Sequence, residues 1–414
     1  MITLLKTTWP LMLGVILIMA GNGLQSSLLG LRGSLEGFSS TMMGLIMSGY
    51  YIGFLASSLL TPRIVRRVGH VRVFGALAAL AAAAVLMAAI VVQPPVWMVS
   101  RMITGFCFAG LYIVAESWIN DRSSNATRGQ LLSVYMLAQY VGLTAGQGML
   151  NLSDPAGFQL FSVVAIVISV AVVPILLLVK HVPSFAEPKH VGLLQLYRIS
   201  PLGTIGVLGT GMAQSAFFSM AAVFGYKIGL DTTQVSFYMM AAVLGGIALQ
   251  WPVGRLSDRL ERRRVFIIIT FLAAIIALAA IYASSMSLLV LTAAAFLYTG
   301  MALPTYSLLV AHTNDFLKAD QMVAASGTLV LLFGIGAIGG PLAIGALMGA
   351  FGPHGFWGYL AAVHAVLGAF AMYRVTRRTA PPREEQGPFV AMPKDATPTA
   401  ANLATHAPTP AGSD

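Results

Sequence analysis

The sequence predicts an all-α membrane protein with twelve transmembrane helices in two pseudo-symmetric bundles of six. Three observations predict this fold class. Hydrophobic residues make up 57% of the chain and charged residues only 9%, whereas a soluble domain usually carries about a quarter charged residues. Apolar stretches of about twenty residues, the length that a helix needs to cross a bilayer, recur along the chain. A basic loop between two such stretches in the first half also has a second copy in the second half.

The first six spans form a predicted N-terminal bundle, residues 1–180. Its first apolar run extends from Trp9 to Leu31 without a clear small-residue cleavage site, so we expect a retained span and not a signal peptide. The next five spans are predicted at residues 41–61, 73–92, 96–119, 129–150 and 159–180.

A polar, proline-containing linker, residues 181–200, divides this bundle from a second one at residues 201–376. The second set of spans is predicted at residues 201–226, 234–254, 265–284, 287–311, 322–350 and 355–375. Residues 377–414 are rich in Pro, Ala and Thr and show no helical period, so a disordered cytoplasmic tail is expected.

The basic residues set the predicted orientation. The formal charge of +10 would also suit a nucleic-acid-binding protein, but nearly all of the 24 Lys and Arg residues fall in alternate loops. Only Arg32, Arg101 and Lys227 lie elsewhere. This is the positive-inside pattern, which places both termini in the cytoplasm and argues against nucleic acid as a partner. The single Cys107 excludes an internal disulfide.

The most informative stretch is the basic loop from Gly254 to Arg264, which reads as a short helical hinge between two spans. On one continuous helix its charged residues Arg255, Asp258, Arg259 and Arg262 would share one face, where they could hold a neighbouring helix end.

The same loop occurs in the first half, where residues 62–74 align with residues 254–266 without gaps. The aligned positions pair Arg63, Arg67, Arg72 and Phe74 with Arg255, Arg259, Arg264 and Phe266. Downstream, Asn120-Asp121 recurs as Asn314-Asp315. The chain is therefore predicted to be two related halves in the same order.

At these residues the sequence resembles the major facilitator superfamily of secondary transporters. The cytoplasmic signature of that family, Gly-x-x-x-Asp-Arg-x-Gly-Arg-Arg, matches residues 254–264 except that Glu261 replaces the second glycine, and the first copy has Arg66 where the family has Asp. Two further signatures appear in order as Arg101, Gly105 and Ala109, and as Glu116 with Arg128-Gly129. The resemblance covers residues 9–375.

Within the family, residues 115–118, 128–132 and 250–258 look like those of the bacterial YcaD-like branch. The resemblance implies a monomeric, multi-pass protein of the bacterial inner membrane that works by alternating access. It implies a small-molecule substrate, a lipid surrounding, protons as coupling ion and no cofactor. No metal cluster, nucleotide-binding loop or catalytic triad is evident in the sequence, so we expect a transporter and not an enzyme.

Ionisable side chains inside a bilayer are costly and therefore informative. Arg101 lies in the outer third of its predicted span. It could contact substrate or take part in proton coupling, as the matching arginine does in the family, or it could be a structural donor to helix carbonyls. His364 reads more simply as a packed neutral histidine than as a proton carrier.

Substrate is expected near the midplane between the halves. The polar and aromatic residues predicted to line that region beside Arg101 are Asn22, Gln25, Tyr112, Gln139, Gln147, Gln214 and Tyr298. None of them is an acid, which favours a neutral or anionic solute such as a vitamin, an aromatic heterocycle or an organic acid. Efflux of lipophilic drugs is the alternative, and a non-transporting membrane sensor or assembly partner with the same fold is the alternative of another class.

A cytoplasmic gate is predicted from the charged ends of the spans. Glu116 is expected to pair with Arg128, unless it is only a solvated acid at the interface, and Asp258 to play the equivalent part in the second half. The full predicted gate is Glu116, Arg128, Arg66, Arg67, Asp258, Arg259 and Arg262. Two glycine pairs, Gly142 with Gly146 and Gly336 with Gly340, are expected either to pack helices closely or to form a sliding surface between the halves.

Overall fold

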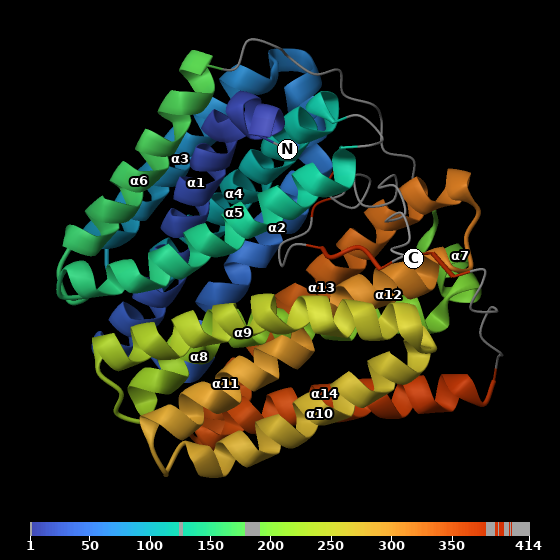
Figure 1. Ribbon diagram of the computed structural model, residues 1–414. Coiled ribbons are helices and arrows are strands. Elements are labelled where there is room, and N and C mark those ends of the chain that lie inside the picture. The colour runs from blue at the N-terminus through green and yellow to red at the C-terminus, as the bar shows by residue number, and fades with distance from the viewer. Residues whose placement is uncertain are drawn as a thin grey trace.

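The structure is a computed structural model that describes residues 2–123, 127–178, 191–377, 386–387, 389–392, 397 and 399. Within these residues it consists of helices and connecting loops, and the helices form two bundles that lie side by side (Figure 1). The N-terminal bundle contains α1 (Ile2–Leu35), α2 (Ser40–Val68), α3 (His70–Ile90), α4 (Pro94–Arg122), α5 (Arg128–Gly148), the short η1 (Met149–Leu152) and α6 (Gln159–Leu178).

The C-terminal bundle begins after a short helix, α7 (Leu193–Ile199). Its helices are α8 (Pro201–Lys227), α9 (Thr232–Arg259), α10 (Arg262–Ala283), α11 (Leu288–Ala302), α12 (Pro304–Asn314), α13 (Ala319–Phe351) and α14 (His354–Val375). Among the described residues, 11 segments are long and apolar enough to cross a membrane, with α11 and α12 counted as one. The more polar α5 completes the twelve, so the predicted fold class is confirmed.

Three local features differ from the predicted elements. The tenth span breaks at Leu303, because Pro304 has no N–H to continue the hydrogen-bond ladder of α11. Residues 193–199, predicted as linker, form α7. The basic loop is not one helical hinge: α9 ends at Arg259 and α10 begins at Arg262, so the four charged residues do not share a single helix face.

The duplication is visible in the way that the helices pack. Gly53 on α2 lies against the carbonyl of Met102 on α4, and its counterpart Gly245 on α9 lies against the carbonyl of Phe296 on α11. In the same manner Gly142 and Gly146 of α5 lie against the carbonyls of Ile16 and Ala20 on α1, while Gly336 and Gly340 of α13 lie against those of Leu208 and Met212 on α8. Each glycine lets two backbones meet because it carries no Cβ.

These contacts show that the two glycine pairs pack helices within each bundle and do not form a sliding surface between the halves. The surface between the halves instead includes Gly44 of α2, which lies against the carbonyl of Pro341 and against Gly345 of α13. Thr41 also donates to the carbonyl of Gly345 over 3.4 Å. Small residues therefore serve both the packing of each bundle and the contact between the bundles.

Gly336→Ala is expected to destabilise the protein, whereas Gly339→Ala, three residues away on the same helix, is not. A Cβ on Gly336 would overlap the backbone carbonyl of Leu208, while a Cβ on Gly339 would meet nothing within 4 Å. Overpacking of this kind costs about 1–3 kcal/mol or more. Melting temperatures of the two variants in detergent measure the difference, and equal values would contradict the described packing.

The bundles have two distinct ends. We call the end that carries the α2–α3 and α9–α10 turns, with Arg66, Arg67 and Arg262, the basic end. At the opposite end the halves meet closely, since Asn151 of η1 donates to Ser236 of α9 over 3.0 Å and Ser236 donates to the carbonyl of Gln147 over 2.7 Å. Ser26 of α1 also donates to the carbonyl of Phe218 of α8 over 3.3 Å.

At the basic end a different segment lies between the halves. Residues 386, 387 and 389–392 lie against α9, α10 and α12, and Thr397 contacts α4 (Figure 1). Met392 and Thr397 are buried. We expected a disordered tail from residue 377. These residues differ from that expectation, because their backbone groups form hydrogen bonds to the bundle. The rest of that expectation lies outside the described residues.

Candidate functional site: a central cavity and a gate at the basic end

A small cavity lies between the two halves, in the part of the helices nearer the end opposite to the basic end. Its volume is about 20 Å³, which is room for about one water molecule and not for a substrate. The lining comes mainly from the N-terminal bundle, with two residues from α8 and α9: Asn22, Ser26, Tyr50, Tyr51, Arg101, Leu143, Gln147, Phe218 and Met239. In this conformation the central site is therefore contracted around its polar groups.

Arg101 brings the one positive charge to this lining. Its side chain comes from α4 and is 2% exposed, and its guanidinium carbon lies 4.5 Å from the centre of the Tyr50 ring. A guanidinium over the face of an aromatic ring gains a cation–π attraction, which is stronger where water is excluded. Arg101 is thus held at the cavity wall by α2.

A short polar network continues from the cavity into the N-terminal bundle. The Asn22 amide donates to the Tyr112 hydroxyl over 2.8 Å and to the Tyr50 hydroxyl over 3.3 Å. On the other side, Gln147 donates to the carbonyl of Gly23 over 3.1 Å and accepts from Ser27 over 2.6 Å. The hydrogen bonds fix the direction of these amides, so the polar wall of the cavity is preorganised.

Five of the residues predicted for the cavity do not line it. Gln214 donates to the carbonyls of Ala302 and Leu303, over 2.9 and 3.3 Å, and so supports the break between α11 and α12. Tyr298 packs inside the C-terminal bundle, with its ring centre 5.3 Å from that of the buried His364. The other three, Gln25, Tyr112 and Gln139, are buried but are absent from the lining.

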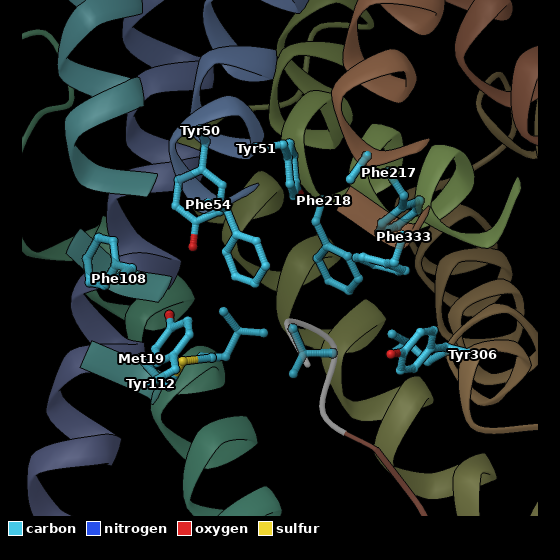
Figure 2. Close-up of a cluster of buried hydrophobic side chains, with 14 of the residues drawn as sticks. Met19, Tyr50, Tyr51, Phe54, Phe108, Tyr112, Phe217, Phe218, Tyr306 and Phe333 are labelled. Carbon is cyan, nitrogen blue, oxygen red and sulfur yellow. The ribbon is translucent and has the colours of Figure 1, made fainter. Parts of the chain in front are cut away.

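Sequence reasoning also missed part of the lining, chiefly its aromatic residues. Tyr50, Tyr51 and Phe54 of α2 face Phe218 of α8 across the boundary between the halves, with Phe217 and Phe333 behind (Figure 2). The signal in the sequence was the pair Tyr50-Tyr51 beside Gly49 and Gly53, because helix-packing glycines fix which face of α2 turns inward.

The predicted pair between Glu116 and Arg128 is not formed in this conformation, and it stays a prediction for a state that is closed at the basic end. Arg128 donates to Ser123 over 3.2 Å. Glu116 is fully buried on α4, where it accepts from the Tyr135 hydroxyl over 2.8 Å and is in contact with the Thr397 hydroxyl. A buried carboxylate with hydrogen-bond donors around it also excludes the alternative of a solvated acid at the interface.

In the second half the gate residues separate into buried and exposed ones. Arg262 makes a buried ion pair with Asp315, at 2.7 and 2.6 Å to the two carboxylate oxygens, and both partners belong to the C-terminal bundle. Burial raises the pKa of Asp315, and the charge and hydrogen bond of Arg262 oppose this shift. Asp258 accepts from the backbone N–H of Phe389 over 2.9 Å. The remaining predicted gate residues, Arg66, Arg67 and Arg259, are exposed.

Arg262→Gln is expected to destabilise the protein by about 3–5 kcal/mol at neutral pH, because it leaves the Asp315 carboxylate buried without its charge partner. The pKa of Asp315 is raised in the native state, so this state binds the proton at a higher pH than the unfolded chain does. Protonation therefore favours the native state, and this contribution is lost as the pH rises through the raised pKa.

The loss in Arg262→Gln should consequently be smaller at acidic than at neutral pH. Melting temperatures of the variant and the parent at several pH values measure this. The double variant Arg262→Gln with Asp315→Asn is the control, since it removes both charges and should recover part of the stability. A loss that is equal at all pH values would contradict the role of the buried pair.

Comparisons with known proteins agree with this architecture. A family model described as Major Facilitator Superfamily matches residues 11–327 and 204–409. The chain is 26% identical over 349 residues to the protein named "Uncharacterized MFS-type transporter YcaD" of Escherichia fergusonii, a match that covers 82% of this chain and 89% of the relative.

Among solved structures, the chain is similar to the nucleoside transporter NupG, with a TM-score of 0.78 and 14% identity over 90% of this chain and 100% of that chain. It is also similar to a D-xylose-proton symporter, with a TM-score of 0.71 and 14% identity over 92% and 98% of the two chains. At this identity the likeness concerns the fold alone.

Proposed function

The chain belongs to the major facilitator superfamily, with YcaD-type transporters among its relatives, and from that premise we propose that it is a proton-coupled secondary transporter of a small neutral or anionic organic solute. The observation that carries this proposal is the buried Arg101 in the wall of the central cavity, where the described lining contains no acid. A desolvated guanidinium recognises a carboxylate or a polar ring edge well.

The proposed orientation has the basic end in the cytoplasm of a bacterial cell, with the protein in the inner membrane. The positive-inside rule supports it, because Arg66, Arg67 and the arginines at 262–264 gather at that end. The close contact of the halves at the opposite end then corresponds to a closed periplasmic side. In this orientation both termini are cytoplasmic.

The shape and chemistry of the cavity wall narrow the proposed substrate. Tyr50, Tyr51 and Phe218 offer ring faces, while Asn22 and Gln147 offer amides in fixed directions. A planar solute with polar edges, such as an aromatic heterocycle, a vitamin or an aromatic organic acid, would use both. The similarity to a nucleoside transporter concerns the fold only, and the substrate class here rests on the lining residues.

Proton coupling requires a group that gains and loses a proton during the cycle. In the N-terminal bundle, the described acids other than Glu116 lie at exposed or half-buried positions in loops or at helix ends. Glu116 is fully buried on α4 and accepts from Tyr135 over 2.8 Å, so it is the proposed proton site. It lies on the same helix as Arg101, which offers a mechanical connection between proton and substrate.

The test is uptake of labelled vitamins, heterocycles and organic acids into proteoliposomes, with and without an imposed pH gradient. Accumulation of one compound that depends on the gradient, and that is lost in Glu116→Gln, supports the proposal. Accumulation that is unaffected by both the gradient and this substitution would overturn the proton coupling. Absence of flux for every anionic and neutral compound would overturn the substrate class.

Efflux of lipophilic compounds is the second candidate function. The aromatic groups on both sides of the cavity, which Figure 2 shows, favour it because ring faces also hold neutral lipophilic molecules. Flux of lipophilic dyes that survives Arg101→Ala would favour this function over transport of anions, since dye binding to ring faces does not need the guanidinium.

A further inference from the structure

The described residues between positions 386 and 399 lie where a transporter of this fold must open and close. These residues are 386, 387, 389–392, 397 and 399. Gly387, Phe389 and Met392 bond to the C-terminal bundle and Thr397 contacts the N-terminal bundle, and the ribbon, red in Figure 1, runs between the two bundles. We refer to these residues as the tail segment.

The tail segment is held to the C-terminal bundle mainly through its backbone. The carbonyl of Gly387 accepts from Arg262 over 2.6 Å and its N–H donates to Asp315 over 3.2 Å. The N–H of Phe389 donates to Asp258 over 2.9 Å. Deeper in, Met392 donates from its N–H to Ser307 over 2.9 Å and accepts at its carbonyl from Gln250 over 3.3 Å.

Apolar contacts accompany these hydrogen bonds. The ring of Phe389 lies directly on Gly254, so that any side chain at position 254 would overlap it. Phe389, Val390 and Ala391 pack against the buried core, and Met392 is 3% exposed. Gly254 begins the basic signature loop, and Asp258 and Arg262 belong to it, so the loop itself forms the docking surface of the tail segment.

The same segment reaches the N-terminal bundle through Thr397, whose hydroxyl contacts the Glu116 carboxylate. Thr397 is fully buried. The tail segment therefore connects α4 of one half with α9, α10 and α12 of the other. Such a connection can exist only while the halves are apart at the basic end, because the segment occupies the space that would close.

We propose that the tail segment is an inhibitory plug, which docks between the halves at the basic end and holds the transporter in the state that is open there. The docking site binds backbone groups together with a phenylalanine and a methionine, and its occupant is the tail segment of this chain. To expose the opposite end, the protein must first release the segment, so docking slows the cycle. The effect on transport rests on the proposed function, whereas docking itself does not.

Docking is tested in the full-length chain with the pair Ser307→Cys and Met392→Cys. Oxidation should form a disulfide in most molecules, because the backbone N–H of Met392 donates to the Ser307 hydroxyl over 2.9 Å, which places the β-carbons of the two positions close together. The native Cys107 is buried. The single variants Ser307→Cys and Met392→Cys, each with Cys107 present, give the background level of disulfide formation. Adding Phe389→Asp to the pair should reduce the yield strongly, since it removes the ring from Gly254. No disulfide, or an equal yield with Phe389→Asp, overturns the docking.

The inhibitory role is tested with two truncations that differ in the tail segment. One chain ends at Arg377 and lacks the segment, and the other ends at Thr399 and keeps it. Ser40 is 3% exposed at the opposite end, so Ser40→Cys reports opening of that end through labelling by a membrane-impermeant maleimide. If the tail segment is undocked in about a tenth of the full-length molecules, labelling should be about tenfold faster in the shorter chain than in the full-length chain. It should be unchanged in the longer one.

Equal labelling of the two truncated chains would overturn the inhibitory role, even where the disulfide forms. Substrate uptake should follow the same order, with the shorter chain faster. If no compound is taken up by any chain, the proposed function fails, but the disulfide and the labelling still decide the plug. The two proposals are therefore separable.

Discussion

Arg101→Ala is expected to abolish substrate uptake while the protein remains folded. The guanidinium is buried in the wall of the central cavity and stacked on Tyr50. Removing a buried charge that binds a partner typically costs about 2–5 kcal/mol, so uptake should fall by at least about thirtyfold. Stability should change less, because alanine is small, apolar and favoured in a helix.

The series Arg101→Lys, Arg101→Ala and Arg198→Ala separates charge from geometry. Lysine keeps the positive charge but not the planar fork, so we expect it to recover only part of the uptake. Arg198 is exposed on α7 and serves as the matched control for the loss of an arginine. Uptake and melting temperature are measured in parallel. Wild-type uptake by Arg101→Ala would overturn the role in substrate binding, and loss of its folded state would favour the structural role instead.

The fold was predictable because many independent features along the chain, the apolar spans and the basic loops, indicate the same architecture. Each span is about twenty apolar residues, and the bases mark alternate loops, so misjudging one span does not change the overall pattern. The tenth span shows the limit of this reasoning. The apolar run from residue 287 to 311 is continuous, yet the helix breaks at Leu303 because Pro304 has no N–H for the helical hydrogen bonds. The side-chain amide of Gln214 donates to the carbonyls of Ala302 and Leu303 at this break.

The candidate site was less predictable, because its members depend on how each helix is rotated. Asn22, Arg101 and Gln147 line the cavity as we expected, whereas Gln214 and Tyr298 point into the C-terminal bundle. A rotation of one residue, 100° on a helix, moves a side chain from the cavity to the bundle interior. The partners of Glu116 in this conformation were not predictable for a related reason, since they include Thr397, more than two hundred residues away along the chain.

The tail segment shows what composition alone misses. Residues rich in Pro, Ala and Thr bury little apolar surface by themselves, which is why the sequence predicts disorder there. Docked between the halves, the described residues obtain their partners from surfaces that already exist, Asp258, Arg262 and Gln250 among them. Low complexity therefore does not exclude a specific docked state when the fold supplies the hydrogen-bonding groups.

Gly44→Leu is expected to shift the protein away from the conformation described here. Gly44 of α2 lies against the carbonyl of Pro341. A Cβ added at Gly44 would stand 3.1 Å from the Cα of Gly345. Both neighbours are backbone atoms of the other half, so they cannot move aside as a flexible side chain would. The halves must therefore separate at the end where Gly44 lies, which is the end opposite to the basic end. The substitution thus favours the conformation in which that opposite end is open.

Spin labels at Leu35 and Phe351 would report this change, because both are exposed and lie on different halves at the opposite end. The distance between the labels should lengthen in Gly44→Leu. It should stay the same in Gly358→Leu, where an added Cβ meets nothing within 4 Å. Uptake should fall severalfold in Gly44→Leu, because alternating access requires each end to close in turn. An unchanged distance would mean that this contact between α2 and α13 does not hold the opposite end closed.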